Sequence, residues 1–289
     1  MLELRTRAMM NCCIGIIQLT YPLISLVAAS YTLLGAYLGS DTSTFLTPLT
    51  VRTALVVGLI VSYSFAFNHY QDVVVDSVNN PARPIPSGRV SRKIAGIVAL
   101  FLAISAIALA STLSLPLLMI ALFNTTLSTL YSCYFKGRVL IGNTTIAFLD
   151  ASIVVYGNLA VGVPTRAAWI VCLLTFSYVL AQEILYTVRD REGDLRGGLR
   201  TVATCFGTAV AIRLFSFCIM GFIAIALLVW FLGLAPDRYL YALVPCCVLP
   251  LVGIVSFLKK SGTIRTVRLS LRMINIVWVL SLLPAILLK

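Results

Sequence analysis

Two short acidic segments, at 68–76 and 183–194, lie where long hydrophobic runs meet basic loops. Together they hold six of the ten Asp and Glu residues of the chain, namely Asp72, Asp76, Glu183, Asp190, Glu192 and Asp194. Carboxylates at the edge of a hydrophobic run are costly, and in membrane proteins they usually have a function. Their oxygens suit a hard cation such as Mg²⁺, which proteins bind through one or two carboxylates together with substrate phosphates and water. The two segments therefore predict metal-assisted chemistry on a phosphorylated substrate.

The first segment places three oxygen-bearing side chains at intervals of four residues: Asn68, Asp72 and Asp76. On a helix this spacing puts them along one face, and we interpret all three as metal ligands and the two aspartates as catalytic. The alternative is a polar helix end whose carboxylates meet only water or arginines. A basic loop with three prolines follows, and such a stiff loop could hold Arg83 and Arg89 over an anion.

The second segment forms a similar stripe, with Glu183, Thr187, Asp190 and Asp194 at intervals of four, three and four residues. We predict that Glu183, Asp190 and Asp194 bind metal and that the two aspartates are catalytic. The alternative is a surface loop whose acids are neutralised by the neighbouring arginines. Glu192 is offset from the stripe.

Three further polar residues are candidates for handling an acceptor or a carbocation. Asp150 lies near the middle of a hydrophobic run, where an acid is a functional candidate; it could also be a hydrogen-bonded aspartate facing a neighbouring helix. His69, the single histidine, could act as a base or hold a helix end. Thr187 could offer its hydroxyl to a metal or a water molecule.

The composition predicts an all-α integral membrane protein. The chain is 60% hydrophobic and 11% charged, with a mean hydropathy of +1.00, and runs of roughly 20 apolar residues, long enough to cross a bilayer, recur along it. We predict nine spans in one domain covering 1–289, arranged as a bundle around a central cavity. The spans are 13–38, 49–69, 94–114, 115–134, 140–162, 167–187, 208–233, 238–258 and 270–288, with a break between the third and fourth at Ser114-Leu115-Pro116.

The basic residues predict the topology. Nine spans place only Arg52, Arg166, Arg238 and Lys289 on one side, which leaves 18 of the 22 Lys and Arg for the other. Since cytosolic loops are enriched in Lys and Arg, we expect a cytosolic N-terminus and both acidic segments on the cytosolic side. The net charge of +12 is then explained by topology and by contact with anionic membrane lipids. No soluble basic domain remains that would bind nucleic acid.

The first segment and its loop read Asn-x3-Asp-x3-Asp over 68–76 and Asn-x-Pro-x-Arg-Pro-Ile-Pro-x-Gly over 79–88. This combined pattern resembles the UbiA superfamily of intramembrane prenyltransferases, most closely the branch with archaeal geranylgeranylglyceryl phosphate geranylgeranyltransferase and chlorophyll synthase. The resemblance implies Mg²⁺-dependent transfer of a C15–C20 isoprenyl group from a polyprenyl diphosphate to a lipophilic acceptor. It also implies that Tyr131 and Lys136 help to bind diphosphate with the loop arginines, although a lysine at a helix end can simply reach lipid headgroups.

Two departures from the family pattern put the usual acceptor in doubt. His69 stands where the family often has Asp, and Tyr186-Thr187 stands where archaeal-type relatives often have Lys-Asp. A terpene cyclase that uses no acceptor is therefore the first alternative. A transporter, which also has polar groups within a helical bundle, is a remote one, because its polar groups would meet near mid-membrane.

Overall fold

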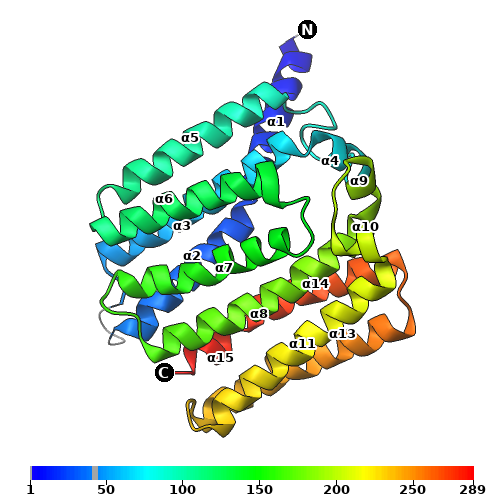
Figure 1. Cartoon of the computed structure of the whole chain (residues 1–289). Helices are drawn as coiled ribbons and strands as arrows, with labels where there is room; N and C mark the ends of the chain where they lie inside the picture. The colour runs from blue at the N-terminus through cyan, green and yellow to red at the C-terminus, as the bar shows by residue number, and fades with distance from the viewer. Residues whose placement is uncertain (1, 41–44) are drawn as a thin grey trace.

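The computed structural model describes residues 2–40 and 45–289, and all regular elements among them are helical. The elements are α1 Leu2–Leu19, α2 Pro22–Gly39, α3 Pro48–Gln71, α4 Val73–Asn79, α5 Arg92–Ala110, α6 Leu115–Leu130, η1 Tyr131–Phe135, α7 Ile141–Leu159, α8 Arg166–Arg189, α9 Arg191–Arg196, α10 Val202–Phe206, α11 Thr208–Phe231, α12 Asp237–Leu243, η2 Val244–Val248, α13 Leu249–Lys260, α14 Ile264–Leu280 and α15 Leu282–Ile286. The long helices lie side by side, and the short helices α4, α9 and α10 gather at one end of them (Figure 1).

Eight helical stretches of the described residues are long and apolar enough to cross a membrane. They are Met9–Gly39, Pro48–Gln71, Arg92–Ala110, Leu115–Phe135, Arg166–Arg189, Thr208–Phe231, Asp237–Lys260 and Ile264–Ile286. They coincide with eight of the nine expected spans, and the expected break near Pro116 is confirmed because α6 begins at Leu115. The fifth expected span, 140–162, coincides with α7, a 19-residue helix that contains Asn143, Asp150 and Asn158 and is not among the eight. Nine spans therefore remain a prediction.

Helix α7 is nevertheless packed closely into the bundle, between α2 and α8. A Cβ atom at Gly157 would overlap the carbonyl oxygen of Thr32, and one at Gly35 would overlap that of Val154. Small residues allow such close backbone approach between membrane helices. The Asn158 side chain also donates to the Gly35 carbonyl over 2.7 Å and accepts from the Thr165 backbone N–H. These contacts fix α7, and hence Asp150, against its neighbours.

The first expected span is interrupted. Instead of one helix over 13–38, α1 ends at Leu19 and α2 begins at Pro22. Between them Tyr21 has φ 44° and ψ 59°, in the left-handed region that only a few non-glycine residues occupy. The Tyr21 ring stacks on Phe65 with centroids 4.5 Å apart and on His69 at 5.6 Å. The break thus turns an aromatic ring toward α3.

A short helix follows each of the two long helices that carry the acidic segments. A 24-residue helix precedes each one, α3 in the first case and α8 in the second, and an aspartate forms each junction. Asp72 has φ −88° and ψ 18°, and Asp190 has φ −96° and ψ 3°. Helices α4 and α9 then pack on each other. The two acidic segments therefore share the same local backbone geometry.

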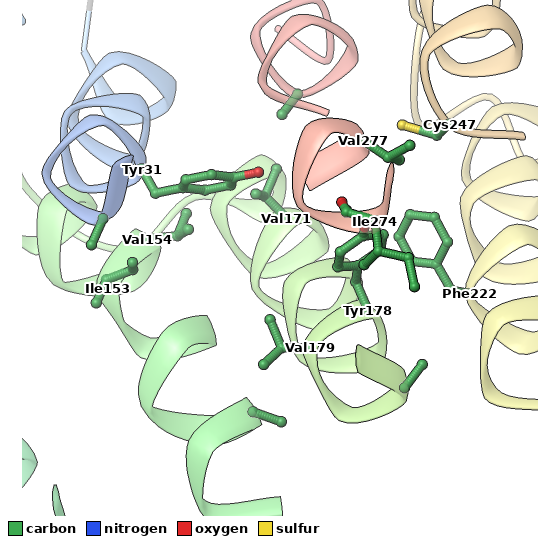
Figure 2. Close-up of a cluster of buried hydrophobic side chains, with 14 of the residues drawn as sticks. Tyr31, Ile153, Val154, Val171, Tyr178, Val179, Phe222, Cys247, Ile274 and Val277 are labelled. Atoms are coloured by element: carbon green, nitrogen blue, oxygen red, sulfur yellow. The ribbon is translucent and has the colours of Figure 1, made fainter. Parts of the chain in front are cut away.

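A buried cluster of hydrophobic side chains holds α2, α8, α11 and α14 together (Figure 2). Tyr178 of α8 packs edge-on against Phe222 of α11 and donates its hydroxyl to the Ile274 carbonyl of α14 over 2.6 Å. Tyr31 of α2 donates to the Trp278 carbonyl over 2.8 Å. Because each buried hydroxyl bonds a backbone carbonyl of α14, the cluster sets the position of that helix relative to α2 and α8.

Candidate active site

A cavity of about 340 Å³ opens among the helices and is lined by residues of α2, α3, α4, α6, η1, α7, α8, α9 and α14. Its lining is mixed. Apolar and aromatic side chains such as Tyr21, Phe65 and Ile153 share it with residues of both acidic segments. A cavity with an apolar interior and a few convergent polar groups is the usual form of a ligand site.

In the first acidic segment the helical path continues through the junction of α3 and α4. The Asp72 N–H donates to the Asn68 carbonyl, and the Asp76 N–H donates to the Asp72 carbonyl, both over 2.8 Å. The three residues therefore keep one face, as expected from their spacing. Asn68 and Asp76 line the cavity, whereas Asp72 is buried and does not.

Asp76 is held between two basic side chains. The Arg83 guanidinium donates to its Oδ1, and His69 Nδ1 lies 3.1 Å from its Oδ2. Burial alone would raise the pKa of Asp76, but the hydrogen bonds from His69 and Arg83 and the charge of Arg83 together lower it. Asp76 is therefore ionised and available as an oxygen ligand at neutral pH. The Nε2 atom of His69 is buried without a partner among the described residues.

Lys136 reaches Asp72 from another part of the chain. Tyr131 begins the π-helical segment η1 and Lys136 directly follows it, and the Lys136 ammonium donates to Asp72 Oδ2. Short π-helical segments often mark functional sites, because the extra residue turns side chains in a new direction. Tyr131 and Lys136 both line the cavity. Lys136 thus contacts the first acidic segment and both residues share its cavity, while their role in binding diphosphate stays a prediction.

The second acidic segment borders the same cavity through Glu183, Thr187, Asp190 and Asp194. Arg189 donates to both carboxylate oxygens of Asp190, over 2.7 and 2.6 Å. The Thr187 hydroxyl donates to the Ile184 carbonyl. Glu192 points away: its side chain is 76% exposed and pairs with Arg196 at 3.6 Å.

Asp194 shows that the two segments share one electrostatic environment. Burial raises its pKa to about 7; the charge of Lys136 lowers it, and the charges of Asp190 and Asp72 raise it. Asp72, with Lys136 bonded to it, belongs to the first acidic segment, whereas Asp190 and Asp194 belong to the second. A cation bound between the two acidic segments would stabilise all of these carboxylates in the ionised form.

Asn79 and Gly193 form the contact between α4 and α9. The Asn79 side chain donates to the Asp190 carbonyl over 2.9 Å and accepts from the Gly193 N–H over 2.8 Å. A Cβ at Gly193 would lie 2.6 Å from the Val75 carbonyl oxygen and would also overlap the Asn79 side chain. Glycine is therefore required for α4 and α9 to approach this closely.

The structure brings most of the predicted site residues to one cavity. Those that line it are Asn68, His69, Asp76, Arg83, Tyr131, Lys136, Asp150, Glu183, Thr187, Asp190 and Asp194. Arg89 does not line it: its guanidinium donates to Gln18, Ser87 and the Ala82 carbonyl instead. The stiff loop thus presents Arg83 to the cavity and turns Arg89 to α1.

Sequence reasoning did not single out several other lining residues, among them Tyr21, Asn124, Gln182, Asn275 and Trp278. Gln182 directly precedes Glu183, and that position was a usable signal. Asn275 is a polar residue within an otherwise apolar run of α14. Neither signal shows which helices meet.

Within the described part of the chain, no group of three or more His, Cys, Asp or Glu side chains is arranged to hold a metal by itself. Mg²⁺, however, usually binds one or two carboxylates and completes its shell with water and substrate phosphate oxygens. The carboxylates here lie beside Lys136, Arg83 and Arg189, which suit the phosphates. The residues therefore fit Mg²⁺ bound together with a diphosphate.

The fold and cavity define a helical membrane protein with two facing acidic segments at one end of the bundle. A model of the UbiA prenyltransferase family matches residues 28–276. The chain belongs to the UbiA prenyltransferase family.

Named relatives are archaeal. The chain is 38% identical over 163 residues to the digeranylgeranylglyceryl phosphate synthase of Methanopyrus kandleri, covering 56% of this chain and 60% of that protein. It is 33% identical over 238 residues to the synthase of the same name from Natronomonas pharaonis, covering 80% and 83%.

Solved structures share the fold. A structure of a digeranylgeranylglyceryl phosphate synthase aligns with a TM-score of 0.72 at 22% identity, covering 95% of this chain and 97% of that one. A UbiA homolog from Archaeoglobus fulgidus bound to DMAPP and Mg²⁺ aligns with a TM-score of 0.69 at 16% identity, covering 92% and 99%.

Proposed function

We propose that this chain transfers an isoprenyl group from a polyprenyl diphosphate to the alcohol of a lipid acceptor, in a Mg²⁺-dependent reaction. The observation that carries this proposal is the convergence of two acidic segments and their basic partners on one largely apolar cavity. Family membership and relatives named as digeranylgeranylglyceryl phosphate synthases support it.

The polar end of the cavity is proposed as the diphosphate site. Asn68, Asp72, Asp76, Asp190 and Asp194 would hold Mg²⁺, with Glu183 as a further candidate about two turns before Asp190 along α8. When bound, Mg²⁺ would neutralise the negative charge that develops on the leaving diphosphate. The neighbouring DMAPP- and Mg²⁺-bound structure in the same fold is consistent with this arrangement.

Arg83, Lys136 and Tyr131 would complete the diphosphate site. The two cations pair with Asp76 and Asp72 in the structure, so an incoming diphosphate with its metal would exchange these partners for phosphate oxygens. Preorganised cations aimed at the leaving group lower the barrier because they stabilise charge that is larger in the transition state than in the ground state.

The reaction exchanges one C–O bond for another. The bond between the allylic carbon and the diphosphate oxygen breaks, and its electron pair leaves with the diphosphate. An acceptor hydroxyl oxygen bonds to that carbon, and its proton passes to a cavity carboxylate, for which Asp150 is the candidate. The apolar cavity excludes the water that would otherwise capture the allylic cation.

The proposed donor is a C15–C20 diphosphate, and the proposed acceptor is geranylgeranylglyceryl phosphate, by analogy with the named relatives. The distribution of Lys and Arg supports a cytosolic N-terminus and a site that opens to the cytosolic side. The isoprenyl tails of both substrates would then lie among the helices while their phosphates remain at the membrane edge.

A terpene cyclase is the second candidate, favoured by His69 and by Tyr186-Thr187 at positions where relatives often have other residues. Purified protein with geranylgeranyl diphosphate and Mg²⁺ distinguishes the two. Turnover that requires geranylgeranylglyceryl phosphate supports transfer, whereas a cyclic hydrocarbon formed without it supports cyclisation.

The same assay separates catalysis from transport. We expect Asp72→Ala to abolish diphosphate release. Undiminished release in both Asp72→Ala and Asp190→Ala would remove the catalytic assignment.

A further inference from the structure

A strip of polar side chains on the cavity wall takes no part in the proposed diphosphate site. This strip, hereafter the α8–α14 strip, comprises Gln182 and Tyr186 of α8 with Asn275 and Trp278 of α14, and all four line the cavity. Gln182 is buried at 6% exposure. A buried polar side chain at a cavity wall requires a partner.

Three hydrogen bonds connect the strip. Gln182 Nε2 donates to Asn275 Oδ1 over 2.5 Å and to the Tyr186 hydroxyl over 3.3 Å. The Tyr186 hydroxyl donates to Asn275 Oδ1 over 3.2 Å. These bonds use the amide nitrogen of Gln182 and the amide oxygen of Asn275, and they lock the two amides relative to each other.

The same bonds leave one hydrogen-bond donor and one hydrogen-bond acceptor of the two amides unused. Among the described residues, Asn275 Nδ2 donates no hydrogen bond and Gln182 Oε1 accepts none. One is an N–H donor and the other a carbonyl acceptor, and both belong to residues that line the cavity. An alcohol both donates and accepts, so it can satisfy both groups at once.

Trp278 adds a second, independent indication. It lies three residues after Asn275, one turn along α14, and its indole Nε1 is buried without a partner in the described structure. Its ring is fixed by stacking on Tyr31, with centroids 5.5 Å apart. Buried donors in proteins are normally satisfied by protein, water or ligand, and this one belongs to a residue that lines the cavity.

The strip is also close to the second acidic segment. Gln182 directly precedes Glu183, and the Tyr186 ring lies under the Arg189 guanidinium, 4.3 Å from its centroid to Cζ. Arg189 in turn pairs with Asp190. Tyr186 places an uncharged hydroxyl at that point of the wall.

We propose that the α8–α14 strip binds the hydroxyl-bearing headgroup of the acceptor and orients its hydroxyl toward the diphosphate end of the cavity. Asn275 Nδ2 donates a hydrogen bond to the acceptor's hydroxyl oxygen, Gln182 Oε1 accepts a hydrogen bond from that hydroxyl, and Trp278 Nε1 donates to a second headgroup oxygen. This assignment rests on the proposed transfer reaction and adds the residues that select the acceptor.

The test measures both Michaelis constants of the full chain in lipid nanodiscs, with geranylgeranyl diphosphate, Mg²⁺ and geranylgeranylglyceryl phosphate. We expect Asn275→Leu to raise the KM for the acceptor about tenfold or more, because it removes a donor and leaves Gln182 unpaired. The KM for the diphosphate donor should stay within about twofold. Tyr186→Phe keeps the ring against Arg189 and should raise the acceptor KM less. Ser270→Ala on the same helix, whose hydroxyl has no described partner and does not line the cavity, is the control.

Hydroxyl recognition has a readout that a merely structural role would not change. An acceptor analogue with hydrogen in place of the hydroxyl should bind the unaltered chain more weakly than the acceptor does, as measured by its inhibition constant. In Asn275→Leu the analogue and the acceptor should bind with similar affinity. If Asn275→Leu does not fold, Asn275→Asp, which keeps Oδ1 and removes the amide donor, replaces it. The proposed role of the α8–α14 strip would be overturned if a folded variant kept the acceptor KM of the unaltered chain and still distinguished the acceptor from the analogue. Absence of acceptor-dependent turnover in the unaltered chain would instead overturn the proposed function.

Discussion

Gly193→Ala tests whether the close approach of α4 and α9 is needed to form the site. The added methyl group would lie 2.6 Å from the Val75 carbonyl oxygen and would overlap the Asn79 side chain, whereas ordinary contacts are 3.4–4 Å. The helix α9 must therefore move away from α4. That movement weakens both hydrogen bonds between Asn79 and the α9 backbone and separates Asp76 from Asp190 and Asp194.

The expected magnitude follows from these contacts. Overpacking by one methyl group costs about 1–3 kcal/mol, and each lost hydrogen bond costs about 1 kcal/mol. The two terms together come to about 3 kcal/mol or more for the closed arrangement, which corresponds to a loss of kcat/KM of about a hundredfold or more, because about 1.4 kcal/mol is a factor of ten in rate. Asn79→Ala loses both hydrogen bonds without the overlap, about 2 kcal/mol, so a loss of about thirtyfold is expected.

The assay is Mg²⁺-dependent release of diphosphate, measured across a Mg²⁺ titration. Since the two acidic segments would bind metal jointly, Gly193→Ala should also raise the Mg²⁺ concentration needed for half-maximal rate. Gly221→Ala is the matched control, because a Cβ at Gly221 meets no atom within 4 Å. Equal rates and equal Mg²⁺ dependence in Gly193→Ala and Gly221→Ala would refute the idea that the α4–α9 contact forms the site.

Four further outcomes follow from the structure. Lys136→Met removes the cation bonded to Asp72, so kcat/KM for the diphosphate donor should fall about tenfold or more; a change confined to the acceptor KM would contradict this role. Asp150→Asn should lower kcat about tenfold or more with little effect on the donor KM, and unchanged kcat would remove Asp150 as proton acceptor. Gly157→Ala should lower the thermal stability in detergent by about 2 kcal/mol or more, because its methyl group overlaps the Thr32 carbonyl; a melting temperature equal to that of Gly221→Ala would show that α2 and α7 can separate freely. EDTA should abolish diphosphate release and added Mg²⁺ should restore it, and release that persists in EDTA would exclude a metal-dependent reaction.

The helical bundle and the acidic face of the cavity could be predicted from sequence because both depend on local patterns. Long apolar runs predict spans whatever their neighbours are, and eight of the nine expected spans agree with the structure. Spacing by four predicted that Asn68 and Asp76 share a face, and the hydrogen bonds through Asp72 maintain that face into α4.

Other features depend on tertiary contacts that a single sequence does not reveal. Nothing in the residue type of Tyr21 predicts a left-handed conformation that interrupts a helix. Gln182 and Asn275 are 93 residues apart and meet only because α8 and α14 pack together. Arg83 and Arg89 lie in the same loop, but only the Arg83 side chain points into the cavity. The conformation of the loop decides this, and the sequence does not show it.

The central claim is that both acidic segments bind one metal-bound diphosphate. An experimental structure with Mn²⁺ and geranylgeranyl thiodiphosphate, in which anomalous scattering locates the metal, tests it most directly. The account predicts Mn²⁺ between oxygens of Asp76 on one side and of Asp190 or Asp194 on the other, with the thiodiphosphate against Arg83 and Lys136. Metal bound by one segment alone, or a thiodiphosphate outside this cavity, would contradict it.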